Sequence, residues 1–336
     1  MGENLNPTIS VIMPVYNCID YIQEAVDSIL NQTFCDFELI IIDDNSSDGT
    51  VDLIKKFNDP RIKLTLKTVN SGITNSLNYG LKIAKGKYIA RMDGDDISFP
   101  DRFERQLQFM NLNPKVVLCG GGYISINHKK EFIPSQDHAE LLFELTYYCP
   151  IAHPTVFIRK NILSQNKIEY DAKYEPAEDF RMWTILSRYG EIANIKEPLI
   201  QYRIHSNQTS ITRAFQQKII SNIIAIEHVK YLSNNHEYFT NFIVKKIETQ
   251  DDFKKYILVE EEIKKQFIAS GFNLNEQSFL KRKKIYLQNA FSDSHYNITR
   301  LNREKIILLI NNFNNIGIYF ILRYFLKCLI GYESKE

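Results

Sequence analysis

The sequence has 336 residues, with 41 Lys and Arg against 40 Asp and Glu, and 44% of its residues are hydrophobic. A near-neutral chain with 24% charged residues excludes global disorder, and the absence of a basic excess argues against nucleic-acid binding as its main activity. The length exceeds what one compact domain usually needs, so we expect one large domain with an appendage, or two domains.

Short apolar runs alternate with amphipathic stretches over the first two hundred residues, which is typical of an α/β sheet with parallel strands. Buried strands are predicted at Ile9–Pro14, Leu39–Ile42, Ile62–Thr68 and Tyr88–Met92. Amphipathic helices are predicted after each of them. In the first of these helices, the apolar residues of one face are Ile22, Ala25, Val26, Ile29 and Leu30.

The predicted strands become shorter further along the chain. They are expected at Val116–Cys119, Thr155–Arg159, Ile192–Ile195 and Leu199–Ile204, with helices near 137–147 and 178–189. After about Thr212 no strand signal remains, and residues 213–330 have helical periodicity. We therefore expect an α/β domain over residues 1–212 and an all-helical extension over residues 213–336.

The two parts differ in charge and share a low cysteine content. Residues 1–214 carry 23 basic and 27 acidic residues, whereas residues 215–336 carry 18 and 13, which indicates two different roles. Five widely spaced cysteines without a CxxC pair predict a reducing compartment. The N-terminus is polar, so we expect no secretory signal. The sequence contains no uninterrupted run of about eighteen apolar residues, so we expect no membrane-spanning helix.

Two acid-rich clusters follow predicted strands, at residues 43–50 and 93–96. In open α/β sheets, ligands bind at the carboxyl ends of the strands. The first cluster is also compatible with an Asx-rich turn that caps the next helix. A calcium loop is excluded there, because Lys55 stands where the bidentate Glu is required. An Asp-x-Asp after a buried strand, as in the second cluster, suits a magnesium or manganese ion that also binds phosphate oxygens.

Four segments, in this order and spacing, resemble the family 2 inverting glycosyltransferases with the GT-A fold. They are Pro14–Asn17 (PVYN), Asn31–Phe34 (NQTF), Phe37–Thr50 (FELIIIDDNSSDGT) and Ala84–Asp96 (AKGKYIARMDGDD). The resemblance covers about residues 7–212. It implies a Rossmann-like, mostly parallel sheet flanked by helices.

The resemblance also implies roles on the donor side of the site. Pro14, Val15, Tyr16 and Asn17 would line the base and ribose pocket, and Asp44, with Asp43 beside it, would meet the uracil or ribose of a UDP-sugar. In the family, the loop that carries Gly72 and Asn75 brings its backbone near the nucleotide. The residues expected around the metal and diphosphate are Arg91, Asp93, Gly94, Asp95, Asp96, Arg102 and Gln106. Spacing alone does not decide which of the three aspartates binds the divalent cation, Mn²⁺ or Mg²⁺.

An inverting transfer needs a base that takes the proton of the acceptor hydroxyl. Ala177–Trp183 (AEDFRMW) resembles the family's Glu-Asp motif, which implies that Asp179 is the base and Glu178 its neighbour. The alternative is that both acids only stabilise the N-terminus of the helix near 178–189. Trp183 either stacks on a sugar or packs in the core.

Two histidines and one arginine complete the expected site. His205, in a Tyr-Arg-x-His stretch, resembles the family histidine that reaches the metal or diphosphate, and Arg203 would offset phosphate charge. His153, in His153-Pro154, is expected either near the acceptor or in a structural hydrogen bond. The run Gly120–Gly122 is a weak indication of close backbone approach to the sugar.

The extension carries a basic run, Lys281–Lys284, and an apolar aromatic stretch, Ile316–Ile330, that contains Arg323 and Lys327. It is interpreted either as a helical bundle that docks on the catalytic domain or as a peripheral contact with an anionic membrane surface. A homo-oligomer is also compatible with it. The resemblance implies assembly of bacterial capsule, exopolysaccharide or lipooligosaccharide on the cytoplasmic side, where a lipid-linked acceptor is found.

The function expected is metal-assisted transfer of a hexosyl or N-acetylhexosaminyl group from a UDP-sugar to a hydroxyl of a growing glycan or lipid-linked saccharide. A sugar-phosphate nucleotidyltransferase is the first alternative, but it would carry a glycine-rich basic loop where Val15–Cys18 stands. A non-catalytic glycan-binding protein is the second alternative, and it would need neither the base nor the metal cluster.

Overall fold

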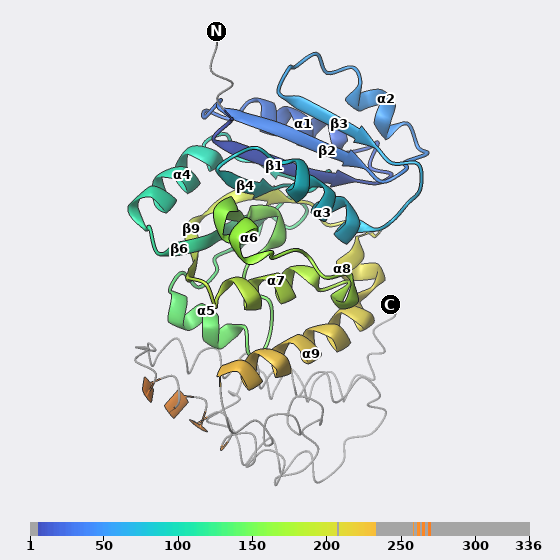
Figure 1. Cartoon of the computed structure of the whole chain (residues 1–336). Coiled ribbons are helices and arrows are strands. Elements are labelled where there is room, and N and C mark those ends of the chain that lie inside the picture. The colour runs from blue at the N-terminus through green and yellow to red at the C-terminus, as the bar shows by residue number, and fades with distance from the viewer. Residues whose placement is uncertain are drawn as a thin grey trace. The chain divides into compact units, whose positions relative to one another are not determined.

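The computed structural model describes residues 6–206 and 208–232, together with 258, 261–262, 264–265 and 268–269. The chain divides into two compact units, Met1–Ile224 and Ala225–Glu336. The first unit holds the whole described sheet (Figure 1). The basic run 281–284 and the apolar stretch 316–330 lie outside the described residues, as does most of the expected helical extension.

The sheet runs in the order β3-β2-β1-β4-β8-β6-β9-β5, and β7 pairs with β6. Its strands are β1 (Ile9–Val15), β2 (Phe37–Asp43), β3 (Ile62–Leu66), β4 (Tyr88–Arg91), β5 (Ile97–Ser98), β6 (Val116–Ser125), β7 (Glu131–Phe132), β8 (Phe157–Arg159) and β9 (Glu191–Tyr202). The first four strands in this order are parallel, and β8 is antiparallel to both β4 and β6. The strand pair β6 and β9 is parallel, and β5 is antiparallel to β9.

Helices cover both faces of the strands β1–β4, with α1 and α3 on opposite faces (Figure 1). The helices are α1 (Ile22–Leu30), α2 (Thr50–Ile54), α3 (Ile73–Ile83), α4 (Arg102–Leu112), α5 (His138–Glu144), α6 (Lys160–Asn166), α7 (Glu178–Leu186), α8 (Thr209–Thr212) and α9 (Ala214–Leu232), with short 3-10 turns at His153–Thr155 and Ala172–Tyr174.

Alternation along β1 explains why two helical layers form. Val11 and Met13 belong to a core that includes Val26 of α1 and Phe103 of α4. Residues on the opposite face of the strand, such as Ile12, contact α3 at Gly80. Because successive side chains of a strand point to opposite faces, a strand that is apolar at every position must be covered on both sides.

The register places the carboxyl ends of the central strands at one edge. Val15 of β1 pairs with Asp43 of β2, and Ile12 of β1 pairs with Arg91 of β4. The acidic clusters that follow β2 and β4 therefore lie on either side of β1, at the same edge of the sheet. In open α/β sheets this edge is where ligands bind.

Four strand predictions, which correspond to three observed strands, were wrong in their bounds. The two strands predicted at Ile192–Ile195 and Leu199–Ile204 form one strand, β9, because register irregularities opposite Gly121 and Gly122 accommodate Pro198. The strand predicted from Thr155 begins only at Phe157, since His153–Thr155 forms a 3-10 turn.

The third strand, β6, continues well beyond the predicted end at Cys119, through Gly120–Gly122. A Cβ on Gly120 would lie 2.5 Å from Ile151 Cγ2, and one on Gly121 would lie 2.4 Å from Leu199 Cδ1. The glycines therefore permit close packing inside the protein, and approach to a sugar does not explain them. The strands β5 and β7 and the helix α6 were missed.

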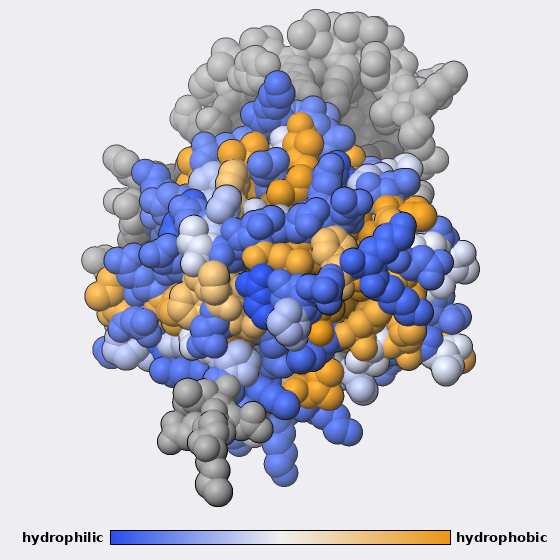
Figure 2. Space-filling model, turned by 90° about the horizontal axis from the view of Figure 1, so that it is seen from above, coloured by the Kyte–Doolittle hydropathy of each residue, from blue (hydrophilic) through white to orange (hydrophobic). Residues whose placement is uncertain are grey.

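Among the described residues, none of the helices combines the length and the hydrophobicity that crossing a bilayer requires. The face in Figure 2 is mostly hydrophilic, with hydrophobic residues in several separate areas between the polar ones.

Candidate active site

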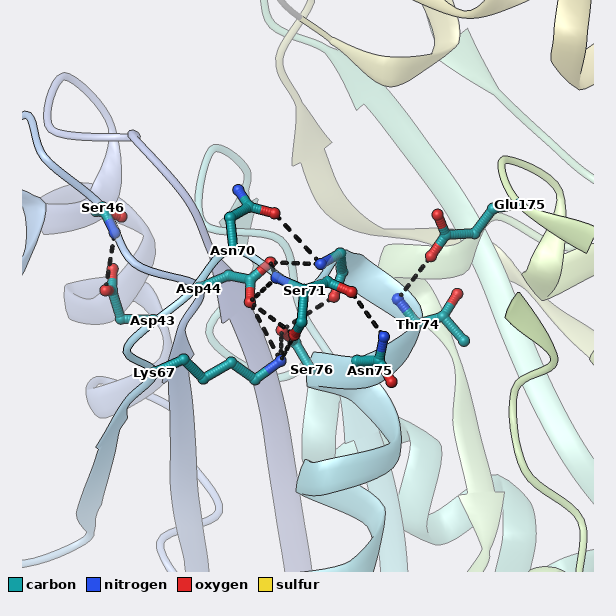
Figure 3. A network of polar contacts seen from close by, with 11 residues as sticks. Asp43, Asp44, Ser46, Lys67, Asn70, Ser71, Thr74, Asn75, Ser76 and Glu175 are labelled. Carbon is teal, nitrogen blue, oxygen red and sulfur yellow. Dashed lines mark hydrogen bonds and ion pairs between the residues drawn. The ribbon is translucent and has the colours of Figure 1, made fainter. Parts of the chain in front are cut away.

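The first acidic cluster binds the loop that leads into α3 (Figure 3). Asp44 is 4% exposed and accepts hydrogen bonds from the backbone N–H of Ser71 (3.0 Å) and of Gly72 (2.8 Å). Lys67 Nζ lies 3.2 Å from Asp44 Oδ1. Burial by itself would raise the pKa of Asp44, but these hydrogen bonds and Lys67 hold it below its usual value. Asp44 is therefore ionised, and it fixes the position of the loop.

Asp43 keeps one oxygen available. Its Oδ2 accepts the backbone N–H of Ser46 at 3.0 Å, whereas its Oδ1 is buried and has no hydrogen-bond partner among the described residues. Buried carboxylate oxygens are rarely left unpaired, so Asp43 Oδ1 is a candidate acceptor for a hydrogen bond from a ligand. Tyr16, the residue that follows β1, is 52% exposed. The pairing of Val15 with Asp43 places the end of β1 beside this cluster. Pro14 is partly buried and Val15 is buried.

Backbone geometry explains why Asn17 and Gly72 stand where they do. Asn17 has a φ of 47° and accepts the backbone N–H of Ser47 at 2.9 Å, which joins the loops after β1 and β2. Gly72 has a φ of 88°, a conformation that favours glycine, and it precedes the first turn of α3. Asn75 Nδ2 donates to the carbonyl of Ser71 at 2.6 Å. The side chain of Asn75 thus stabilises the loop.

The second acidic cluster brings three carboxylates together. One oxygen of each of Asp93, Asp95 and Asp96 lies within 4.8 Å of the others. Arg91, 4% exposed, forms an ion pair with Asp93. Burial raises the pKa of Asp93 to about 6 despite Arg91, and burial with the neighbouring carboxylates raises the pKa of Asp96 well above its usual value. Arg91 alone therefore does not stabilise the ionised form of all three carboxyls, whose burial and mutual repulsion favour protonation.

The residues of this cluster fit a divalent cation. Asp96 Oδ2 is buried without a hydrogen-bond partner in the described part of the chain, and the donor set consists of carboxylate oxygens. Hard cations such as Mg²⁺ and Mn²⁺ prefer such oxygens. Gly94 lies close to the end of β1, since a Cβ there would lie 3.0 Å from Val15 Cγ1 and 3.1 Å from Cys18 Sγ, and these side chains would have to shift slightly to admit it.

The end of β9 reaches the same cluster from more than a hundred residues away. His205 Nε2 lies 2.8 Å from Asp95 Oδ2. Arg203 donates its backbone N–H to Asp96 Oδ1 and its Nε to the carbonyl of Asp95, both at 2.9 Å. Arg203 is therefore engaged in holding the acidic loop.

Two residues of this arrangement, Glu24 and Tyr21, were missed in the sequence analysis. Arg203 pairs with Glu24 at 2.6 Å, and its guanidinium lies 4.8 Å from the ring centre of Tyr21. The ring of Tyr21 is also 5.1 Å from that of His205. Both missed residues belong to the start of α1, and no local pattern links that helix to residues 203–205.

The buried Arg102 holds the end of β4, the strand that leads into the second acidic cluster. Its guanidinium donates to the carbonyl of Arg91 at 2.8 Å and to Gln106 Oε1 at 3.0 Å. Gln106 in turn donates to the carbonyl of Thr155 at 2.8 Å. Both side chains are fully buried, so they position the strand that carries the acids and do not reach a ligand themselves.

Asp179 lies in the first turn of α7 and is partly buried. Its Oδ1 accepts the backbone N–H of Phe180 at 2.7 Å, and Cys149 Sγ lies 3.7 Å from its Oδ2. Burial raises the pKa of Asp179, although the Phe180 N–H and the nearby Arg91 oppose this shift. Glu178 is 5% exposed, and burial, together with Asp179, raises its pKa to about 8. Asp179 is also close enough to Asp93 to raise the pKa of that carboxyl.

A cavity of about 300 Å³ opens at Asp179. The residues that line it come from the Cys149 loop, the start of α7 and the first turns of α9, and are Cys149, Ala177, Asp179, Phe180, Ala214, Gln217, Lys218 and Ser221. Its volume is at the lower end of what small-molecule sites provide. A carboxylate with a raised pKa at the wall of a polar pocket is typical of a general base.

His153 and Trp183 are buried together. His153 Nε2 lies 2.9 Å from Tyr170 Oη, and the ring centres of His153 and Trp183 are 5.6 Å apart. Burial lowers the pKa of His153 well below its usual value, so the ring is neutral. Trp183 is 0% exposed and presents no ring face to a sugar. The burial favours the structural alternatives for both residues, a hydrogen bond for His153 and core packing for Trp183.

Comparisons with known proteins agree with this architecture. Residues 10–171 match the family model described as glycosyl transferase family 2. A Haemophilus influenzae protein named as an uncharacterized glycosyltransferase is 35% identical over 243 residues, which cover 68% of this chain and 75% of that protein. The chain therefore belongs to glycosyl transferase family 2, and it is a glycosyltransferase. Chondroitin synthase of Pasteurella multocida is 30% identical over 268 residues, covering 75% of this chain and 26% of that protein.

Solved structures show the same fold. Residues 1–349 of S. aureus TarS, in complex with UDP-GlcNAc, have a TM-score of 0.56 and 18% identity, with 84% of this chain and 81% of that chain covered. A Pyrobaculum calidifontis mannosyltransferase in complex with GDP-Man and Mn²⁺ has a TM-score of 0.54 and 13% identity, with 99% and 89% covered. These likenesses confirm the GT-A fold that the sequence motifs predicted.

Proposed function

We propose that the protein is a metal-dependent inverting glycosyltransferase that moves a sugar from a UDP-sugar to a hydroxyl of a glycan or lipid-linked saccharide. The observation that carries the proposal is the position of Asp179, which lines a pocket and also influences Asp93 of the acidic cluster electrostatically. The transfer needs, within one site, a base for the acceptor hydroxyl and a group that stabilises the charge of the leaving diphosphate. Asp179 and the acidic cluster are the candidates for these two roles. The TarS complex with UDP-GlcNAc supports a uridine nucleotide as the donor.

The nucleotide is proposed to bind between the ends of β1 and β2. Asp43 Oδ1, buried and without a partner among the described residues, would accept a hydrogen bond from the ribose or the uracil. Asp44 would act mainly by holding the loop at Gly72, since it accepts the backbone N–H of that residue, and the loop backbone would then approach the nucleotide. Tyr16, exposed and aromatic, would pack against the base.

The diphosphate is proposed to bind at the second acidic cluster. Asp93, Asp95, Asp96 and His205 would hold the divalent cation. When bound there, such a cation supplies positive charge that offsets the charge that develops on the leaving diphosphate. Arg91 keeps Asp93 oriented, and Arg203 keeps the loop of Asp95 and Asp96 in place.

The acceptor is proposed to bind in the pocket at Asp179. The carboxylate takes the proton of the attacking hydroxyl while the bond between the sugar and the diphosphate breaks on the opposite face, which inverts the anomeric configuration. Glu178, with a pKa of about 8, stays protonated at neutral pH and leaves the negative charge on Asp179. Gln217, Lys218 and Ser221 of α9 form the polar wall that faces the acceptor.

A donor panel tests this proposal. UDP-sugars and, as a control, GDP-mannose are incubated with the protein and Mn²⁺, and nucleotide diphosphate release is measured with and without EDTA. We expect release from at least one UDP-sugar, lost with EDTA and restored by excess Mn²⁺. NMR of the product should show the opposite anomeric configuration to the donor. Metal-independent release, or none from any donor, would contradict the proposal.

The biological setting is proposed from relatives. Chondroitin synthase of Pasteurella multocida is named for making a polysaccharide, which supports a role in surface polysaccharide synthesis. The domain boundary at residue 212 and contact of the extension with the cytoplasmic face of the inner membrane remain proposals, as does homo-oligomerisation. The basic run 281–284 and the apolar stretch 316–330 support the membrane contact.

A further inference from the structure

Glu175, which no motif singled out, connects two parts of the proposed site. It lies four residues before Asp179, and its side chain is 21% exposed. Its Oε1 accepts the backbone N–H of Thr74 at 3.1 Å, across 101 residues of sequence (Figure 3). Thr74 is in the first turn of α3, where backbone N–H groups have no partner within the helix. Glu175 therefore supplies from outside the cap that the preceding residues of α3 do not provide.

The loop that Glu175 contacts is the one held by Asp44. Gly72 donates to Asp44 Oδ2 at 2.8 Å on one side, and a Cβ on Gly72 would lie 3.4 Å from Glu175 Oε1 on the other. The carboxylates of Asp44 and Glu175 thus bind the two sides of one short turn (Figure 3). A negative charge is stabilising at this end of α3 because of the helix dipole.

The segment of Glu175 also contacts the wall of the Asp179 pocket. Glu175 Oε2 lies 3.7 Å from Arg213, just before α9. The carbonyl of the next residue, Pro176, accepts a hydrogen bond from Gln217 Nε2 at 2.9 Å. Residues 175 and 176 are therefore attached to α3 on one side and to α9 on the other, immediately before the base.

We propose that Glu175 is a positioning residue that holds the base-bearing segment against the nucleotide-side loop, so that the loop at Gly72 and Asp179 keep a fixed mutual geometry. Glu175 is assigned no contact with either substrate, and the inference rests on the proposed function in taking residues 70–74 as the donor loop. The bond to Thr74 carries this role. The Arg213 pair contributes less, since Arg213 is 42% exposed.

The test compares Glu175→Ala with Glu175→Gln. Titration calorimetry with UDP and Mn²⁺ should show about fivefold weaker UDP binding for Glu175→Ala, because UDP binding must then supply the free energy that this helix cap had supplied to order the loop. Glu175→Gln retains an oxygen that can accept the Thr74 N–H, so its UDP affinity should stay within about twofold of wild type. At saturating donor, kcat should fall in the alanine variant and recover in the glutamine variant, because the base segment is anchored again.

Glu169→Ala is the matched control, since Glu169 is an exposed carboxylate in the same part of the chain. It should leave UDP binding and kcat unchanged. Thermal unfolding of each variant identifies a merely structural effect, which would lower the melting temperature without changing kcat per folded molecule. Equal UDP affinity and kcat in wild type and Glu175→Ala would overturn the inference alone. No UDP binding by wild type would overturn the proposed function and the inference with it.

Discussion

Asp179 and Glu178 are neighbours in sequence, yet their surroundings assign them different protonation states. Glu178 is buried, its Oε2 has no hydrogen-bond partner in the part of the chain that the structure describes, and its pKa of about 8 keeps it neutral at pH 7. Asp179 accepts the Phe180 N–H and lines the pocket. Two close carboxyls rarely ionise together, so a neutral Glu178 favours the charged form of Asp179.

Replacement of the proposed base gives the most direct prediction at this scale. Asp179→Asn keeps the shape of the side chain but cannot take a proton, so kcat should fall by about 10²- to 10⁴-fold. Its UDP affinity should remain close to that of wild type, because Asp179 is proposed to contact the acceptor and not the nucleotide. Steady-state kinetics and calorimetry measure the two quantities. Retained turnover would sink the assignment of the base.

Glu178 predicts a dependence of stability on pH. Its pKa is raised in the folded state, from the ordinary value of 4.5 to about 8, so the folded state holds the proton that the unfolded state releases. Folding therefore loses stability as pH rises from about 4.5 to about 8, and this contribution is fully present only below that range. Glu178→Gln removes the effect.

In urea unfolding, Glu178→Gln should match wild type near pH 5. At pH 9 it should be more stable than wild type by about 4 kcal/mol. A constant difference at both pH values would show that Glu178 is not protonated in the folded protein.

At the scale of elements, the acidic loop after β4 depends on the end of β9. Arg203 bonds to the backbone of Asp95 and to the side chain of Asp96, and pairs with Glu24 of α1. Groups that orient metal ligands without touching the metal typically change metal affinity by about 10- to 100-fold. The contacts of Arg203 thus join the end of β9, the acidic loop after β4 and the helix α1 at the proposed metal site.

Removal of this arginine side chain should weaken cation binding. Arg203→Ala loses the Nε bond to Asp95 and the pair with Glu24, so we expect about tenfold weaker Mn²⁺ binding in the presence of UDP. Calorimetry measures it directly. Arg105→Ala is the control, because Arg105 also pairs with an acid, Asp101, and bonds to β9 at the Pro198 carbonyl, but its hydrogen bonds and ion pairs in the described part of the chain do not involve Asp93, Asp95 or Asp96. Equal Mn²⁺ affinity in Arg203→Ala and wild type would refute the supporting role.

The glycines of β6 give a second prediction for an element. A Cβ on Gly121 would overlap the Leu199 side chain of β9, and overpacking in a core costs about 1–3 kcal/mol. Gly121→Ala should be destabilised by this amount in urea unfolding. Combination with Leu199→Ala removes the overlap, so the double variant should be more stable than the sum of the single effects predicts. Additive effects would exclude this contact as the reason for Gly121.

At the scale of the whole molecule, the division of charge remains informative. Much of the acidic excess of residues 1–214 is placed in the two clusters and at Asp179, whereas the basic excess of residues 215–336 lies mostly outside the described residues. An anionic bilayer attracts clustered Lys and Arg by about 1 kcal/mol for each residue near its surface. The membrane proposal therefore concerns the extension.

Flotation with vesicles tests it. The full chain should float with vesicles containing anionic phosphatidylglycerol, and less with vesicles of phosphatidylcholine alone. A chain that ends near residue 300 lacks the apolar stretch 316–330 and should float less than the full chain. UDP binding by the shortened chain, measured first, is the control for its folding. Equal flotation of both chains would contradict the proposal.

Local patterns were sufficient for the parallel strands β1–β4, for α1 and for the acids that follow β2 and β4. Each of these signals lies within a few residues, as a run of apolar positions ended by polar ones. The strands β5 and β7 have two residues each, and no local pattern marks them. They are defined by their pairing with distant strands, in which Ile97 pairs with Gln201 and Tyr123 pairs with Phe132. The small apolar content of α6, with only Leu163 buried, explains why it was missed.

The sequence by itself determined the family, the fold and the residue types that carry the proposed chemistry, because these are encoded in short motifs at strand ends. Only the tertiary structure decided which distant groups meet. His205 with Asp95 and Glu175 with Thr74 are each separated by more than a hundred residues. The physical reason is that strand order and crossovers set such contacts. Burial is likewise decided only by folding. It places Trp183 in the core and raises the pKa of Glu178.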